Sequence, residues 1–232
     1  MGPDASRRAR TSGSQLYDSG RDLHYDKPKL RGWLHFVSFV AALVVGTVLV
    51  AEQRGAALTT DALVYAGVVA GLFGASALYH RGTWSARNSA RLQRVDHVMI
   101  ILLIAGTATP PMQVCLSGSW RVVALTVLWT LAGAAIAIRL ARMHASERLV
   151  GAIYIGLGWV AGTGIPAVWV HSGATAGILL LCGGVLYMVG AIGYHRRWPD
   201  PCPSYFGYHE VFHTYVTVAA VFQYVAIAFF VL

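Results

Sequence analysis

The chain has 232 residues, of which 56% are hydrophobic and only 12% carry a charge. A soluble domain has about twice that charged fraction, so the composition excludes a soluble globular protein and predicts a membrane protein. The formal net charge of +8 does not indicate nucleic acid binding, because the arginines lack interleaved aromatic residues and cytoplasmic loops of membrane proteins collect basic residues.

Residues 1–31 form the first predicted segment. They contain seven basic residues among Ser, Gly and Asp, without apolar periodicity, which is typical of a disordered chain. The first apolar run begins at Trp33 and has the full length of a span, so it is not a signal peptide. We therefore expect a disordered basic cytoplasmic tail over 1–31 and a membrane domain over 32–232.

Seven apolar runs follow, each close to the 20 or so residues that a transmembrane helix needs. The predicted spans are 33–51, 62–80, 95–112, 122–140, 149–170, 174–195 and 209–231. The third is expected to end at Pro110-Pro111, because proline interrupts the hydrogen bonds of a helix. The sequence thus predicts an all-α integral membrane protein, a seven-transmembrane helix bundle.

Basic residues predict the orientation of this bundle. All Lys and Arg residues but two fall in the tail or in the second, fourth and sixth connections, and only Arg54 and Arg121 fall on the other side. Cytoplasmic loops carry such an excess of positive charge. The N-terminus is therefore expected in the cytoplasm and the C-terminus outside.

Polar residues gather at three span ends that this topology places at the cytoplasmic boundary. Ser76 and His80 stand four residues apart at the end of the second span, so they share one helix face. Asp96 opens the third span, and His209 and His213, again four apart, open the seventh. Ionisable groups inside a membrane protein are costly to bury and tend to mark function.

These residues predict a metal centre with hydrolytic chemistry. Three imidazoles, from His80, His209 and His213, can hold Zn²⁺ and leave a fourth position for water, although other first-row ions also suit them. Asp96 can orient that water or accept its proton, and Ser76 can donate a hydrogen bond to a developing oxyanion. The alternative is a hydrogen-bond network that holds helix ends together. The remaining histidines are interpreted as interfacial anchors: His24, His35, His97, His144, His171 and His195.

The stretch 209–213 also reads HExxH, the pattern of zinc metalloproteases, with Glu210 as general base. A protease needs a further metal ligand, for which His80 is available. Asp96 and Ser76 would then have no role in the reaction. The alternative is that Glu210 forms an ion pair with Arg196 or Arg197 across the short loop.

Taken together, these motifs resemble the hemolysin III branch of the progestin and adipoQ receptor (PAQR) family. The stretches that carry the resemblance are 76–80, 94–97 with 104–110, and 206–213, with a weaker match over 183–187. It extends from about residue 27 to the end and covers all seven spans. The chain departs from the family pattern at Ala108, Pro111 and Gln223, none of which is an expected ligand.

The resemblance implies a zinc ion bound by His80, His209 and His213, with Asp96 holding the zinc-bound water and Ser76 beside it. Since the wider superfamily includes alkaline ceramidases, it also implies hydrolysis of a lipid amide. Membrane lipids are then the expected partners, and the plasma membrane of a bacterium is the expected location.

Two other functions compete with a hydrolase. One is a non-catalytic protein of lipid sensing or membrane homeostasis, in which zinc ties helices together. The other is a pore-forming cytolysin, which needs a polar stripe along several spans. The middles of the seven runs are apolar apart from Gln223 and small residues, which disfavours a pore. A transporter is also disfavoured, because transporters usually bind near the midplane.

Overall fold

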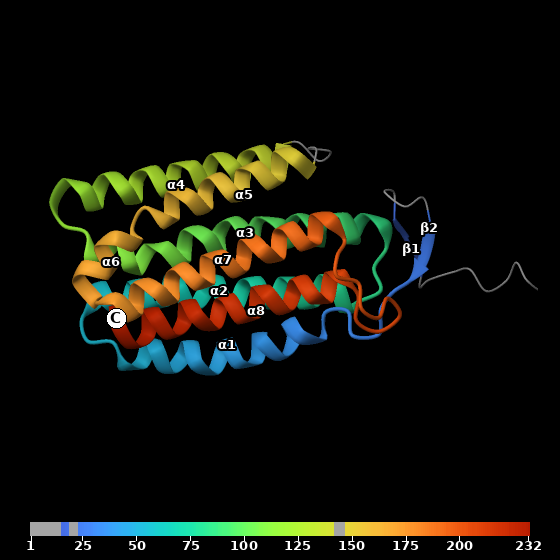
Figure 1. Cartoon of the computed structure of the whole chain (residues 1–232), viewed down its shortest axis with the longest axis horizontal. Helices are drawn as coiled ribbons and strands as arrows, with labels where there is room; N and C mark the ends of the chain where they lie inside the picture. The colour runs from blue at the N-terminus through green and yellow to red at the C-terminus, as the bar shows by residue number, and fades with distance from the viewer. Residues whose placement is uncertain (1–14, 19–22, 142–146) are drawn as a thin grey trace, which may run out of the picture.

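The protein is a bundle of long helices (Figure 1). The computed structural model describes residues 15–18, 23–141 and 147–232. Its helices are α1 (Trp33–Glu52), α2 (Ala56–Arg81), α3 (Ala86–Cys115), α4 (Gly118–Ala141), α5 (Glu147–Gly162), α6 (Ile165–Ser172), α7 (Ala174–Arg196) and α8 (Tyr208–Ala226), the last continued by a π-helical turn, η2 (Ile227–Val231). Within this part of the chain, 7 spans are long and apolar enough to cross a membrane, α5 with α6 forming one of them. The predicted seven-helix membrane class is confirmed, while the orientation of the termini stays a prediction.

The third span does not end where the sequence predicted. α3 continues through Pro110 and Pro111 to Cys115, so the expected stop is wrong. Each proline lacks an N–H for the helix ladder. However, α3 contacts α2, α4, α5 and α6, and Pro110 is completely buried. Tertiary packing on several sides therefore holds the backbone helical in spite of the missing hydrogen bonds.

The fifth span is interrupted, although the sequence predicted one helix over 149–170. α5 ends at Gly162 and α6 begins at Ile165, with Pro166 in its first turn. Since Pro166 has no N–H, it cannot continue the α5 ladder, but it is well placed to start a new helix.

The segment before α1 is more ordered than the tail predicted over 1–31. Strands β1 (Gln15–Asp18) and β2 (Leu23–Asp26) pair in antiparallel register. The N–H groups of Lys29 and Leu30 then donate to the carbonyls of Ser204 and Tyr205, each at 3.1 Å. These contacts lie far apart in sequence, and composition cannot reveal them. The rest of the predicted disorder, over 1–14 and 19–22, lies outside the described residues.

The distribution of polarity is inverted relative to a soluble domain. Large apolar side chains such as Trp120, Val170 and Phe229 lie on the surface, while Glu210 and His213 are among the buried polar residues. An exposed apolar surface of this extent needs lipid around it, and ionisable groups in a membrane protein face the bundle interior. The inside of the bundle is therefore where its chemistry belongs.

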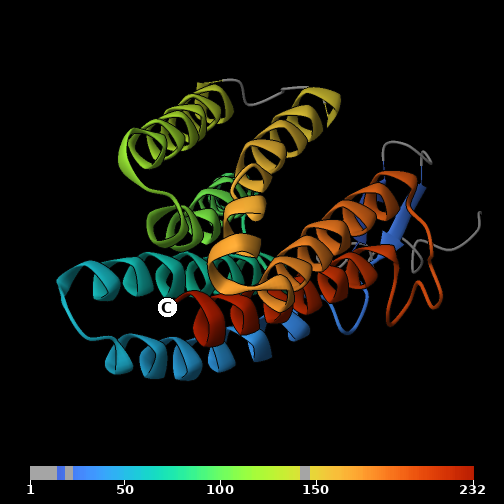
Figure 2. The ribbon, with the colours of Figure 1, turned by 60° about the vertical axis from the view of Figure 1, so that its left-hand side comes forward.

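The arrangement of the helices brings several helix ends together. α1 packs on α2 and α8, α2 packs on α3, and α7 packs on α8. Figure 1 shows the start of α1, the end of α2, the start of α3 and the start of α8 at the same end of the bundle, beside the β1–β2 hairpin. The C-terminus lies at the opposite end. Figure 2 shows α4 and α5 on the far side of α3 from α1.

Candidate metal centre

The last turns of α2 supply the first part of the site. Ser76 and His80 lie one turn apart and both are buried, with exposed fractions of 2% and 8%. The helix ends directly after them, at Arg81, before the loop that leads into α3. They share one face of α2, as their four-residue spacing predicted, and their burial shows that this face is turned toward the bundle interior.

The start of α8 supplies the second part. Glu210 caps this helix, because its Oε2 accepts a 2.9 Å hydrogen bond from the N–H of Gly207. Asp200 adds a further hydrogen bond, with its Oδ1 accepting from the N–H of Tyr208 at 2.9 Å. The cap fixes where the helix begins and thereby puts His209 and His213 on one inward face.

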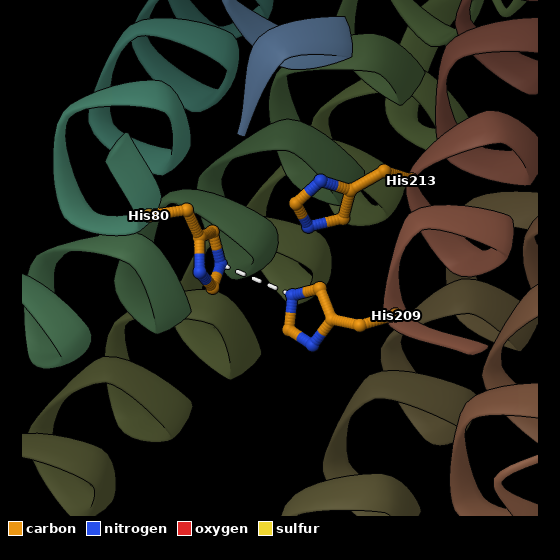
Figure 3. A group of neighbouring side chains, drawn as sticks. All are labelled: His80, His209 and His213. Carbon is orange, nitrogen blue, oxygen red and sulfur yellow. Dashed lines mark hydrogen bonds between the residues drawn. The ribbon is translucent and has the colours of Figure 1, made fainter. Parts of the chain in front are cut away.

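His80, His209 and His213 point toward one another in the structure (Figure 3). Each offers one ring nitrogen, and these three atoms all lie within 4.8 Å of one another. The Nε2 atoms of His80 and His209 are 3.2 Å apart. A tetrahedral zinc ion with bonds of about 2.0–2.1 Å separates two of its ligand atoms by about 3.3 Å. The His80 and His209 nitrogens stand at that separation, and the His213 nitrogen lies within 4.8 Å of both, so the three imidazoles could hold such an ion.

Asp96 and Ser76 form a hydrogen-bonded pair between α3 and α2. Asp96 is buried, with an exposed fraction of 8%. A carboxylate in this position offers oxygen atoms that accept hydrogen bonds, next to a helix end that carries His80. The structure thus gathers the three histidines and joins Asp96 to Ser76, which lies one helical turn from His80.

His35 joins this group, although the sequence interpretation took it for an interfacial anchor. It lies in the first turn of α1 with an exposed fraction of only 3%. Its Nδ1 is 2.9 Å from the Oγ of Ser76, and its ring stacks on that of His213 with centroids 3.7 Å apart. The signal was available, because His35 opens a span at the same membrane boundary as the other polar residues.

His97 was also taken for an interfacial anchor and has a different place. Its ring is hydrogen-bonded to Arg139 of α4, and its carbonyl accepts a hydrogen bond from the Tyr154 hydroxyl of α5 at 3.3 Å. It therefore links three helices. His171 and His195 do lie exposed near helix ends, whereas the side chain of His24 and all of His144 lie outside the described part of the chain.

Glu210 does not have the surroundings that the HExxH interpretation requires. Its Oε1 is paired with the Nε of Arg31, and its Oε2 accepts the capping hydrogen bond. Both oxygens are thus occupied, away from a role as general base. The expected ion pair with Arg196 or Arg197 is wrong as well, since the partner comes from the segment before α1.

That segment closes over the site. Gly32 has a φ of +78°, and a Cβ added there would lie 2.9 Å from the Cβ of His80. The Lys27 amine donates to the Gly82 carbonyl at 3.2 Å just beyond α2, and burial together with the neighbouring Arg31 lowers the pKa of Lys27 from its ordinary value. Residues 27–32 therefore form a strap that touches the ends of both histidine-bearing helices.

This fold and this cluster define a multi-pass membrane protein with a candidate metal centre at one end of its bundle. The sequence model of a family described as Haemolysin-III related matches residues 23–224. The chain belongs to that family, which confirms the resemblance stated above.

Two curated relatives are similar over the larger part of the chain. Hemolysin-3 of Bacillus cereus is 31% identical over 138 residues, and a Hemolysin-3 homolog of Bacillus subtilis (strain 168) is 26% identical over 140 residues. In both cases 60% of this chain is matched, and the match covers 60% and 62% of the relatives. The chain therefore spans less than two thirds of the length of these curated relatives.

Proposed function

We propose that the chain is a zinc-dependent hydrolase that cleaves an amide bond in a membrane lipid, in the manner of a ceramidase. The observation that carries the proposal is the convergence of three imidazoles with the buried Asp96–Ser76 pair. Three histidines with an open fourth position are typical of catalytic zinc, whereas structural sites usually have four protein ligands.

Each residue of the centre has a task in this proposal. His80, His209 and His213 hold the ion, which supplies a Lewis acid and lowers the pKa of water toward about 7. Asp96 orients the attacking water and accepts its proton. Ser76 interacts with both His35 and Asp96, which favours a role in orienting that carboxylate over the oxyanion role expected from the sequence.

A membrane lipid suits the surroundings of the centre. The centre lies at one end of the bundle, where spanning helices are expected to meet lipid head groups, and the outside of the helices is apolar. The amide class rests on the resemblance to alkaline ceramidases. Since both curated relatives come from Bacillus species, we place the protein in the plasma membrane of a bacterium, with the tail in the cytoplasm.

The test is hydrolysis of defined ceramides and other lipid amides by detergent-purified, zinc-loaded protein, with Asp96→Asn beside the wild type. Asp96→Asn keeps the size of the side chain and removes its charge. We expect it to retain about one zinc per chain and to lose activity by about 100-fold or more, which is what a general base usually contributes. Activity that persists in Asp96→Asn contradicts the mechanism, and metal-free, well-folded wild type contradicts the metal centre.

A non-catalytic role with structural zinc is the second candidate. It is favoured by the strap, because residues 27–32, α2 and α8 all meet at the histidines and a metal there ties distant parts of the chain together. It predicts zinc and a large loss of stability on zinc removal, with no turnover of any lipid. A pore through a single chain finds little support, since residues such as Phe73, Leu103 and Val216 pack together inside the bundle.

A further inference from the structure

His35 has a position that the proposed hydrolase does not yet use. It is buried in the first turn of α1 and touches both parts of the centre, the Ser76 hydroxyl through Nδ1 and the His213 ring through a stack with an interplanar angle of 7°. Phe73 packs edge-on against it, with ring centroids 5.1 Å apart. Packing on two sides restricts the ring to one orientation.

The hydrogen-bond roles in this group follow from counting hydrogens. A hydroxyl has one hydrogen to donate, and an ionised carboxylate can only accept. Since Ser76 is hydrogen-bonded to Asp96, its hydrogen goes to that carboxylate. The Oγ of Ser76 must then accept from His35, so the imidazole carries its hydrogen on Nδ1.

We propose that His35 is a positioning residue of the metal centre, which orders Ser76 and, through Ser76, the carboxylate of Asp96. This inference rests on the proposed function, since it concerns how that carboxylate is presented to the open position of the metal. Partners of this kind outside the ligand set change metal affinity or activity by about 10- to 100-fold when they are removed. His35 contacts Ser76, and Ser76 contacts Asp96, so His35 acts through Ser76 and does not itself bind the metal.

Three substitutions separate this role from simple packing. His35→Phe keeps a ring that can stack on His213 but removes the N–H, and His35→Asn keeps an N–H donor near the position of Nδ1 but removes the ring. Ser76→Ala removes the hydroxyl through which His35 acts. His35→Leu serves in place of His35→Phe if that variant is not recovered folded.

The readout is the visible absorption of the cobalt-loaded proteins in detergent, together with their metal content. Cobalt(II) absorption responds to the ligands of the ion and to what surrounds its solvent position. We expect His35→Phe to keep about one metal per chain and to shift the bands as Ser76→Ala does. His35→Asn should keep the wild-type spectrum, and His35→Phe added to Ser76→Ala should cause no further shift.

The outcomes distinguish this inference from the proposed function. Wild-type bands in His35→Phe, or a shift that adds fully to that of Ser76→Ala, overturn the positioning role. If none of the variants shifts the cobalt absorption bands, the positioning role is overturned too, because His35 and Ser76 then do not affect the solvent position of the metal. Absence of metal from the wild type removes the metal centre itself. If the spectra behave as expected but no lipid amide is cleaved, the positioning role stands and the hydrolase fails.

Discussion

Two pairs of polar residues lie on α2, one near each end of the helix. Asp61 and Tyr65 stand four residues apart near its start, as Ser76 and His80 do near its end, and all four are buried. Among the described residues, one oxygen of Asp61 and the hydroxyl of Tyr65 have no hydrogen-bond partner. Ser76 and His80, in contrast, are bonded to side chains of α1, α3 and α8.

The surroundings of the two pairs explain the difference. Tyr65 packs into an apolar cluster with residues such as Leu49, Val168 and Ile227. At the other end, α1, α3 and α8 contribute imidazole and carboxylate groups, and the strap contributes the guanidinium of Arg31. Helical spacing puts two polar residues on one face, but only polar groups from other helices turn that face into a site. The predictions below test this contrast, from the largest expected effect to the smallest.

The largest effect is expected from the metal ligands. His209→Ala removes one of three ligands, so the zinc content of purified protein should fall from about one per chain to near zero. Zinc at 1,000 times its dissociation constant stabilises the fold by about 4 kcal/mol, and a chelator should lower the melting temperature of the wild type accordingly. The matched control is Asp61→Asn, which should keep its zinc. Zinc that remains in His209→Ala contradicts the ligand assignment.

The next effect concerns the ion pair between Arg31 and Glu210, the residue that caps α8. Glu210→Ala leaves the guanidinium of Arg31 buried without its partner, which typically costs about 3–5 kcal/mol. The double variant Arg31→Met with Glu210→Gln removes both charges and should recover much of that loss. The measurement is chemical or thermal unfolding in detergent. A double variant as unstable as Glu210→Ala shows that the charges do not act as a pair.

This ion pair also shows where sequence reasoning ended. The four-residue spacing predicted that Ser76 shares a helix face with His80, and His209 with His213. The positive-inside pattern predicted that both pairs lie at the same membrane boundary. Arg31, the partner of Glu210, lies 179 residues away in a segment without apolar periodicity. No local sequence pattern connects the two residues. Pairing of this kind depends on which helices are neighbours, which the sequence of one chain does not state.

The same limit explains His35 and the prolines. The sequence places His35 at the same boundary as the other polar residues, but its contacts with Ser76 and His213 follow only once α1 is known to pack against α2 and α8. Pro110 and Pro111 read as a helix stop because intrinsic preference disfavours proline inside a helix. Burial of α3 among its neighbours overrides that preference. The number and polarity of the spans were thus predictable, whereas the end of the third span, the break in the fifth and individual side-chain contacts between spans were not.

A smaller effect is expected where the strap meets α2. Gly32→Ala should cost about 1–2 kcal/mol for the left-handed backbone, and its Cβ should press on His80 and weaken zinc binding. Gly55 is the matched control at the other end of the bundle, because its φ is +98° but an added Cβ would meet nothing within 4 Å. Gly55→Ala should therefore lose stability without losing zinc. Equal zinc affinity in the two variants contradicts a role of the strap in holding His80.

The smallest effect returns to the start of α2. Tyr65→Phe removes a buried hydroxyl without a partner, so the free energy of unfolding should stay unchanged or rise by less than about 1 kcal/mol. Ser76→Ala, which breaks two hydrogen bonds of a connected group, should instead lower it by about 1–2 kcal/mol. Both values come from unfolding of the zinc-loaded proteins in the same detergent. A loss above about 1 kcal/mol in Tyr65→Phe means that its hydroxyl is bonded in the native protein. Buried polar side chains would then be hydrogen-bonded at both ends of α2. The gathering of bonded polar groups would no longer distinguish the end with His80 as the functional site.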